Sequence, residues 1–231
     1  MESRVDGVQL EEGGGMRVER ISVDEARPWI LGKHYAKRMP CITDCYGAFV
    51  DGGIVGVCSF GIPASPSLCV GVCGEEYKDK VLELNRLCVD DDSDISRSAF
   101  VAKCIKRLSQ IYTTGKCKPN GRIIVSYADT AQGHIGKIYQ ATNWLYTGCT
   151  KERTDIGGDD NRHSRHYDKG CDYSLNRKPR SAKHRYVYFV GHKWWKKQAL
   201  GKLKYEVIPY PKGDSARYDA SAKIERQLIM M

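Results

Sequence analysis

The chain has 231 residues, of which 41% are hydrophobic, and its formal net charge at pH 7 is +9. This length and apolar content predict one folded domain with a single sizeable core. No apolar run approaches the roughly 18 residues that a membrane helix needs, and the polar start of the chain lacks the apolar stretch of a secretory signal. We therefore expect neither a membrane-spanning nor a secreted protein, and no membrane partner.

The ten cysteines are expected in a reducing compartment, the cytoplasm, where disulfides are rare. They form no Cys-x-x-Cys pair, and the closest regular spacing is the four-residue step of Cys41/Cys45 and Cys69/Cys73. We interpret most of them as small buried hydrophobic residues rather than as metal ligands.

The positive charge is concentrated in residues 151–204, which carry 15 Lys or Arg and 6 Asp or Glu, while the rest of the chain nets zero. A neutral body with one strongly cationic segment favours an anionic partner, nucleic acid above all. The alternative is a solvated face that only keeps the protein soluble.

The first half of the chain predicts one helix followed by strands. Residues 1–15 are polar, end in three glycines, and are expected to be flexible. Ser22 and Glu25 form a capping box, which begins a helix that extends to about residue 35. Strands are predicted at 46–50 and 54–60, joined by a glycine-containing hairpin turn, and at 81–89.

The second half alternates helices and strands and ends in irregular segments. Apolar residues at helical spacing predict a helix over 100–112, and a second helix is expected near 132–142. Strands are predicted at 122–127, 144–149 and 185–190. Residues 151–182 have no periodicity and are expected to form a long loop, and residues 205–231 a loosely held tail.

The order of strand, loop, helix, strand, helix and strand over residues 81–149 resembles the core of the Gcn5-related N-acetyltransferase (GNAT) superfamily. This resemblance implies an α+β fold with a mixed central sheet flanked by helices, carrying a basic insertion and a C-terminal tail. One domain would cover residues 16–204 and include the basic, DNA-binding insertion 151–204.

The resemblance also implies a donor site for acetyl-CoA or a related acyl-CoA. Leu84–Val89 resembles the strand whose backbone pairs with the pantetheine arm of the cofactor. The glycine-containing loop that follows it in the superfamily is replaced here by residues 94–99. The residues that would then hold the cofactor are Leu87, Cys88, Val89, Arg97, Ser98 and Ala99.

Candidate catalytic residues follow in the next strand and helix. Ile124–Asp129 resembles the fifth strand of the superfamily, and it contributes Ser126 and Asp129. Tyr139 resembles the tyrosine that commonly protonates the departing thiolate. The alternative for Tyr139 is a helix tyrosine that only packs on the sheet.

A third segment, Lys33–Pro40, places His34 and Tyr35 among cations in a turn, which favours the edge of an active site. With this segment included, the whole chain resembles the Mom family of phage DNA-modification proteins. The resemblance implies conversion of adenine to N6-carbamoylmethyl (methylcarbamoyl) adenine in double-stranded phage DNA, which protects it from host restriction. The protein would then act in the cytoplasm of the infected bacterial host.

That product joins N6 to a methylene carbon, which ordinary acyl transfer does not do. A redox metal such as iron is therefore a candidate for the unusual step, with His34, Tyr35 and Asp129 as candidate ligands. A second cluster, His163, His166 and Cys171, is interpreted as a loop that contacts phosphate.

DNA contact is predicted for basic and aromatic residues, because cations neutralise phosphates and rings stack or wedge between bases. Of the adjacent Trp194 and Trp195, one is expected to pack inside and one to face outward. The predicted DNA-binding residues are Lys33, Arg38, Tyr127, Lys183, Arg185, Lys193, Trp194, Lys196 and Lys197.

Two other functions stay open on the sequence. One is a conventional GNAT N-acetyltransferase acting on a protein or a small amine, and the other is a DNA-binding protein without catalysis. The oligomeric state is also open, a homodimer included.

Overall fold

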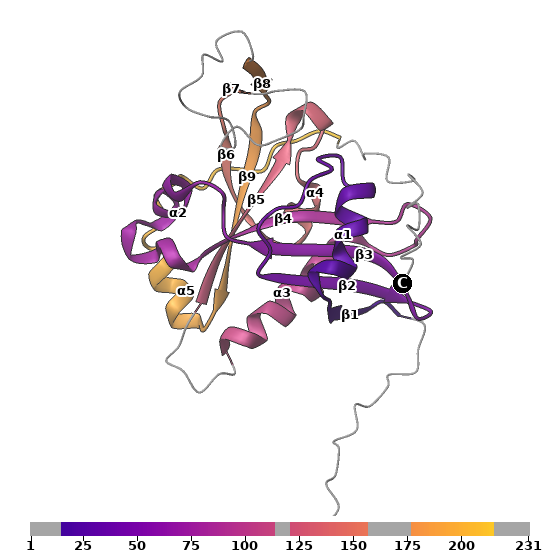
Figure 1. Cartoon of the computed structure of the whole chain (residues 1–231). Helices are drawn as coiled ribbons and strands as arrows, with labels where there is room; N and C mark the ends of the chain where they lie inside the picture. Colours follow the sequence, from indigo (N-terminus) through magenta and orange to yellow (C-terminus); the bar gives the residue numbers. More distant parts are fainter. Residues whose placement is uncertain (1–14, 114–120, 157–176, 215–231) are drawn as a thin grey trace, which may run out of the picture.

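A seven-stranded mixed sheet forms the centre of the computed structural model, which describes residues 15–113, 121–156 and 177–214 (Figure 1). The strand order is β1-β2-β3-β4-β5-β9-β6; β4 and β5 run parallel, and the other neighbours run antiparallel. The strands are β1 (Arg17–Arg20), β2 (Asp44–Val50), β3 (Gly53–Gly61), β4 (Val81–Val89), β5 (Gly121–Asp129), β6 (Leu145–Cys149) and β9 (Lys183–Gly191). The predicted α+β fold with a mixed sheet is thus confirmed.

Helices cover both faces of this sheet. They are α1 (Val23–Gly32), α2 (Pro66–Cys73), α3 (Arg97–Thr113), α4 (Lys137–Ala141) and α5 (Lys193–Leu200), with the short 3₁₀ helices η1 (Glu75–Lys80) and η2 (Thr130–Gln132). A separate two-stranded hairpin pairs β7 (Arg153–Ile156) with β8 (Arg177–Arg180).

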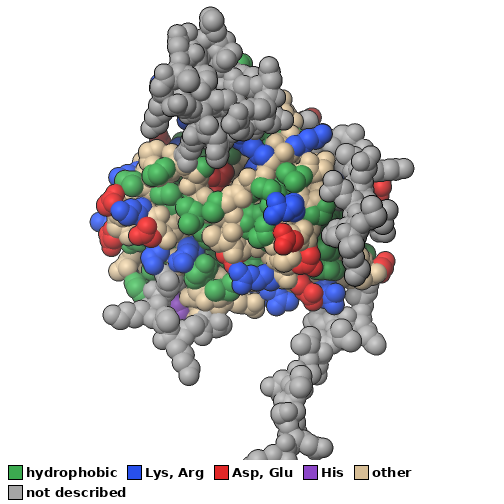
Figure 2. Space-filling model, in the orientation of Figure 1, with side chains coloured by type: hydrophobic (Ala, Val, Ile, Leu, Met, Phe, Trp, Pro, Cys, Tyr) green, Lys and Arg blue, Asp and Glu red, His purple; other side chains and the backbone are tan. Residues whose placement is uncertain are grey.

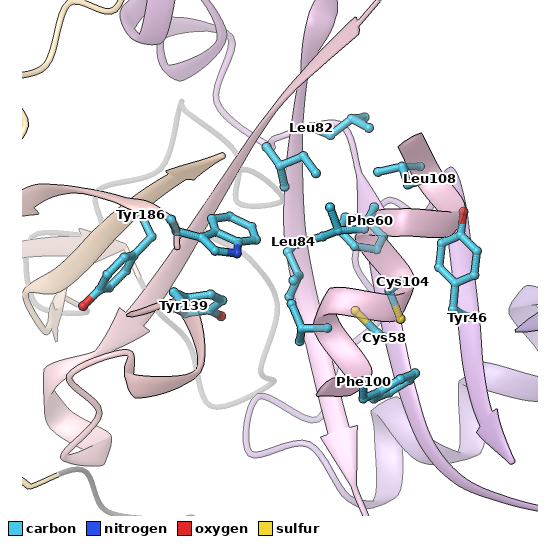
Figure 3. Close-up of a cluster of buried hydrophobic side chains, with 14 of the residues drawn as sticks. Tyr46, Cys58, Phe60, Leu82, Leu84, Phe100, Cys104, Leu108, Tyr139 and Tyr186 are labelled. Carbon is cyan, nitrogen blue, oxygen red and sulfur yellow. The ribbon is translucent and has the colours of Figure 1, made fainter. Parts of the chain in front are cut away.

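The two faces separate the core into clusters because successive strand residues point to opposite sides. Ile124 packs with α3 and α4 on one face, while Ile123 packs with α2 and α5 on the other. The α1 side has its own cluster around Ile30 and Val57. Figure 3 shows the first cluster, in which Leu84 of β4 lies between Phe100 of α3 and Tyr139 of α4.

The local signals of the sequence place the first helix as predicted. Ser22 caps α1: its hydroxyl accepts from the amide of Glu25, and the Glu25 carboxylate accepts from the amide of Ser22 at 2.7 Å. Pro28 is accommodated inside the helix, and the chain leaves the helix at Lys33.

Several elements differ from the prediction. The α2 segment has small and apolar residues on all sides, so no amphipathic period marked it, and the prolines suggested only the end of a strand. The predicted helix at 132–142 is reduced to α4, because Gly133 and Gly136 hold positive φ angles that interrupt it. β1 and α5 were also not predicted.

The segment after residue 203 is packed rather than loosely held, as far as it is described. The amide of Lys204 donates to the Val72 carbonyl, and the amide of Ile208 donates to the Tyr146 carbonyl, at 2.9 and 3.0 Å. The Tyr210 hydroxyl donates to the Trp144 carbonyl at 2.8 Å. The prediction failed because these bonds join distant parts of the chain and leave no local pattern.

The predicted loop of residues 151–182 begins and ends with the two strands of the hairpin β7–β8, and the rest of the basic insertion forms β9 and α5. Its middle, which includes His163, His166 and Cys171, lies outside the described residues, as do residues 1–14 and 215–231. Within the described ranges, no helix is both long and apolar enough to cross a membrane.

Candidate active site

A cleft of about 860 Å³ opens where β4 and β5 part. The two strands pair at Val81–Glu83 with Ile123–Val125, and the cleft lies beyond that pairing. Its walls come from β4, the end of β5, the turn before α4, and the start of α3. The lining includes His34, Tyr35, Leu84, Asn85, Arg86, Leu87, Asp91, Asp94, Arg97, Ser98, Tyr127, His134 and Tyr139.

Ser126 and Tyr139 meet at the inner end of the cleft. The Ser126 hydroxyl lies 3.0 Å from the Leu84 carbonyl and 2.8 Å from the Tyr139 hydroxyl. Because the carbonyl can only accept, the single hydroxyl hydrogen of Ser126 suits Leu84, and Tyr139 can then donate to Ser126. Burial raises the pKa of Tyr139 above its ordinary value, so this hydroxyl stays protonated at neutral pH.

Asp129 is anionic and fully engaged. Its carboxylate forms an ion pair with Lys183 and accepts from the Ser181 hydroxyl and from the amide of Ala131. Burial opposes the charge, but the hydrogen bonds from Lys183 and Ser181 outweigh it and hold the pKa of Asp129 below its ordinary value. In this conformation Asp129 fixes the end of β5 to β9 and is a poor proton acceptor.

His34 and Tyr35 lie in the cleft, with their rings stacked at 4.3 Å between centroids. Burial, together with Arg86 and His134, lowers the pKa of His34 to about 3. Its Nδ1 accepts from the amide of Ala36 at 3.0 Å, which places the proton of the neutral ring on Nε2. His34 is therefore a hydrogen-bond donor here.

His134 belongs to the same site and was not predicted from the sequence. Its ring meets Tyr35 edge to face at 6.3 Å between centroids, and its amide donates to the Asp129 carbonyl. Desolvation lowers its pKa, with Asp129 opposing and Lys183 adding to the effect. The glycines on either side of the His134-Ile135 pair were the available signal, because they indicate a turn.

Arg86 is a second residue that the sequence did not single out. Its guanidinium lines the cleft and donates to the carbonyls of Asn85 and Arg38 at 2.6 and 3.1 Å. Its buried Nε has no hydrogen-bond partner among the described residues. A buried cation held by carbonyls is suited to an anionic or carbonyl group of a substrate.

The predicted donor residues separate into two groups. Leu87, Arg97 and Ser98 line the cleft. The side chains of Cys88 and Val89 are buried in the core, and the amide of Ala99 donates to the Ser96 hydroxyl at 3.3 Å. Arg97 forms an ion pair with Asp91 of the preceding loop. The β4 residues that line the cleft are thus Leu84, Asn85, Arg86 and Leu87, and at the α3 end the one cation, Arg97, is paired with a carboxylate.

The candidate iron ligands do not fit a metal site. Asp129 already accepts from three donors, one of them the Lys183 ammonium, and Nδ1 of His34 accepts from a backbone amide. In the part of the chain that the structure describes, no three His, Cys, Asp or Glu side chains are grouped to hold a metal.

Three of the predicted DNA-binding cations are already engaged by the protein. Lys33 pairs with Asp90 at 2.8 Å and is 9% exposed, and Lys183 pairs with Asp129. Arg185 donates to Thr147 and lies 3.3 Å above the Tyr205 ring. The prediction for these residues rested on their positive charge alone and did not include the side chains that they contact in the folded protein. Tyr127 lines the cleft. The Arg38 carbonyl accepts a hydrogen bond from the guanidinium of Arg86, which also lines the cleft.

The remaining candidates lie together on α5. Lys193, Lys196 and Lys197 are exposed, Trp194 is 48% exposed, and Trp195 is buried, so the two tryptophans divide as predicted. α5 follows the end of β9 that pairs with Gly121, while the cleft lies at the Asp129 end (Figure 1). Figure 2 shows Lys and Arg scattered among other side chains on the face drawn, without one continuous basic patch.

Known proteins are similar to this chain in sequence and in structure. The chain is 29% identical over 211 residues to methylcarbamoylase mom of Escherichia phage Mu, a match that covers 85% of this chain and 84% of that protein. Among solved structures it is similar to a putative acetyltransferase from Acinetobacter baylyi (TM-score 0.45, 11% identity, 78% of this chain and 94% of that one). It is also similar to the ribosomal-protein-S18-alanine N-acetyltransferase from Escherichia coli (TM-score 0.44, 6% identity, 77% and 96%). The model of the Mom protein family matches residues 15–212, and the chain belongs to this family.

Proposed function

We propose that this protein is a transferase that modifies adenine at N6 in double-stranded DNA, giving the carbamoylmethyl (methylcarbamoyl) base and protecting phage DNA from host restriction. Membership of the Mom family and the likeness to the phage Mu methylcarbamoylase support the reaction. The observation that carries the site is the cleft between β4 and β5, which brings together His34, Tyr35, His134 and Tyr139 from three separate segments.

The adenine must leave the base stack to reach this cleft. An enzyme that works on a base inside a duplex flips the nucleotide out, at a cost of a few kcal/mol. Tyr35 and Tyr127, which line the cleft, are proposed to stack on the flipped base, and Tyr35 is 39% exposed and accessible. DNA contact outside the cleft is proposed for the exposed lysines of α5.

The adenine N6 is a weak nucleophile because its lone pair is delocalised into the ring, so a base must take its proton. His134 is the proposed acceptor, because it lines the cleft and desolvation lowers its pKa, which favours the neutral ring, whereas Asp129 is paired with Lys183 and Nδ1 of His34 accepts from a backbone amide. As the N6–H bond breaks, its electron pair remains on nitrogen and forms the bond to the methylene carbon of a donor of the type X–CH2–CONH2, in which X is the leaving group. The leaving group of the donor departs with its bonding pair, and Tyr139 supplies its proton.

The test is mass spectrometry of nucleosides from the DNA of cells that express the protein. Wild-type protein is expected to give deoxyadenosine heavier by one carbamoylmethyl group, and Tyr139→Phe to lower the yield at least about tenfold. Tyr112→Phe is the matched control, because Tyr112 lies at the end of α3 beside Arg122 and away from the cleft. Unmodified DNA with wild-type protein would refute the proposal.

Acetylation analysis of the same cells and DNA binding by the purified protein distinguish the two other functions. Acetylated protein or small amines, with unmodified DNA, would point to a conventional N-acetyltransferase. Tight DNA binding that is unchanged in Tyr139→Phe, with no modified nucleoside, would point to a DNA-binding protein without catalysis.

A further inference from the structure

The start of α3 forms one end of the cleft, and it is the place where a phosphorylated donor would be expected to bind. Ser96, Arg97 and Ser98 all line the cleft there. The first amides of a 17-residue helix carry partial positive charge and favour anions. The side chains and backbone amides at this end of the cleft therefore determine which donors can bind there.

Several polar groups at this end are paired within the protein. The Ser96 carbonyl accepts from the amide of Phe100 at 2.9 Å, and the Ser96 hydroxyl accepts from the amide of Ala99 at 3.3 Å. The Ser96 and Ser98 hydroxyls lie 3.0 Å apart. These bonds are the ordinary cap of a helix, and they place side chains between the first turn and the cleft.

Arg97, the one cation in the first turn of α3, is also paired within the protein. The Arg97 guanidinium forms an ion pair with the Asp91 carboxylate, and their side chains are 23% and 30% exposed. Partial burial makes this pair stronger than one at an open surface. Asp94 adds a second carboxylate to the same end of the cleft.

Asp91 neutralises the Arg97 guanidinium, and a diphosphate that binds the remaining N–H groups of Arg97 would lie beside the Asp91 and Asp94 carboxylates. The negative charges of the diphosphate and of the two carboxylates would repel each other. This repulsion offsets much of the attraction between the diphosphate and the Arg97 guanidinium. Residues 90–99 contain no glycine, so every position carries a side chain where a phosphate would need close contact with the backbone.

We propose that Asp91 fills the anion subsite of the cleft, and that the donor binds through a neutral arm along β4, without recognition of a nucleotide diphosphate. This inference rests on the proposal that the cleft is the donor site. It assigns to Asp91 and Arg97 the role of excluding phosphate rather than binding it.

Isothermal titration of the full chain with acetyl-CoA and with S-acetylpantetheine, which has the same thioester arm and no diphosphate, tests the proposal. The two dissociation constants are expected to agree within about threefold. Asp91→Asn is expected to tighten acetyl-CoA binding by about tenfold, because Arg97 can then pair with the diphosphate, and to leave S-acetylpantetheine unchanged. Asp92→Asn, an exposed neighbour outside the lining, is the matched control and is expected to change neither.

Wild-type protein that binds acetyl-CoA at least ten times more tightly than S-acetylpantetheine would overturn the inference and leave the donor site in place. So would an Asp91→Asn variant, folded as shown by an unchanged melting temperature, that binds acetyl-CoA more weakly. Binding of neither thioester would overturn the donor-site assignment itself and this inference with it, while nucleoside analysis would still report on the DNA modification.

Discussion

The His34 ring is held neutral by its surroundings, and this has a consequence for stability. The side chain is 5% exposed, and burial next to Arg86 and His134 lowers its pKa to about 3. In the unfolded chain a histidine titrates at about 6.5. Between these two values the unfolded state binds a proton that the folded state does not, so acid favours unfolding.

His34→Gln is therefore expected to flatten the pH dependence of stability. The contribution from His34 is fully present above pH 6.5 and is lost as the pH falls toward the folded pKa. At pH 5 the wild-type free energy of unfolding is expected to have fallen by about 2 kcal/mol more than that of the variant. Urea unfolding of both proteins at pH 7 and pH 5 measures this, and parallel curves would contradict the assigned pKa.

At the scale of elements, the turn from Gly133 to Gly136 determines where the site residues stand. Both glycines have positive φ, +64° and +78°. The Ile135 carbonyl between them accepts from the Tyr186 hydroxyl at 2.5 Å and from the Gln140 amide at 3.1 Å. This turn fixes His134, which lies within it, and the first turn of α4, which follows it and carries Tyr139.

Gly136→Ala is expected to be much more damaging than Gly52→Ala. Both positions have φ near +80°, so each alanine costs about 1–2 kcal/mol in backbone strain. A methyl group at Gly136 would also lie 2.4 Å from the Tyr186 ring, whereas nothing lies within 4 Å at Gly52. Urea unfolding is expected to give at least about 2 kcal/mol of additional loss for Gly136→Ala. Equal losses would show that the turn tolerates displacement.

The sequence predicted those elements that carry their own local signals. The capping box, the glycine hairpin and the apolar period of α3 were enough for α1, β2–β3 and α3. α2 consists almost entirely of small and apolar residues, so its sequence has no polar face. The hydrogen bonds of residues 204–210 cross from α2 to β6, and no local pattern encodes such contacts.

The candidate site was predicted in part for the same reason. Tyr139, Ser126, His34 and Tyr35 were singled out because family motifs surround them. Of these, Tyr139, His34 and Tyr35 line one cleft, and Ser126 is hydrogen-bonded to Tyr139. The partners of Asp129 and Arg97 were not foreseen, because Lys183 and Asp91 meet them only in the folded chain. Pairing therefore changed the expected role of both residues.

At the scale of the whole molecule, the cleft and α5 lie at opposite ends of β5 and β9. The nine residues of β9, at about 3.3 Å each, span roughly 30 Å. This length corresponds to about nine base pairs of B-DNA at 3.4 Å each. A duplex that reaches both the cleft and the lysines of α5 must therefore extend well beyond the target base.

Replacing Lys193, Lys196 and Lys197 by alanine is expected to weaken DNA binding equally for all sequences. If each lysine neutralises one phosphate, the slope of log affinity against log salt falls by about 2.7 in magnitude. Fluorescence anisotropy with 20-base-pair duplexes of two sequences at several salt concentrations measures this. Alanine at Lys103, Lys106 and Arg107 removes the same charge from α3, on the other face, and is expected to change little. A sequence-selective loss would indicate base reading by α5.

The segment at 204–210 also covers the outer strand of the sheet. β6 lies at the edge of the sheet, and the amide of Ile208 donates a hydrogen bond to the Tyr146 carbonyl of that strand. An uncovered edge strand is a template for pairing with another chain. A premature stop codon before Lys204 would thus leave β6 exposed, and the truncated protein would be lost to aggregation in the cell although every residue of the cleft had been translated.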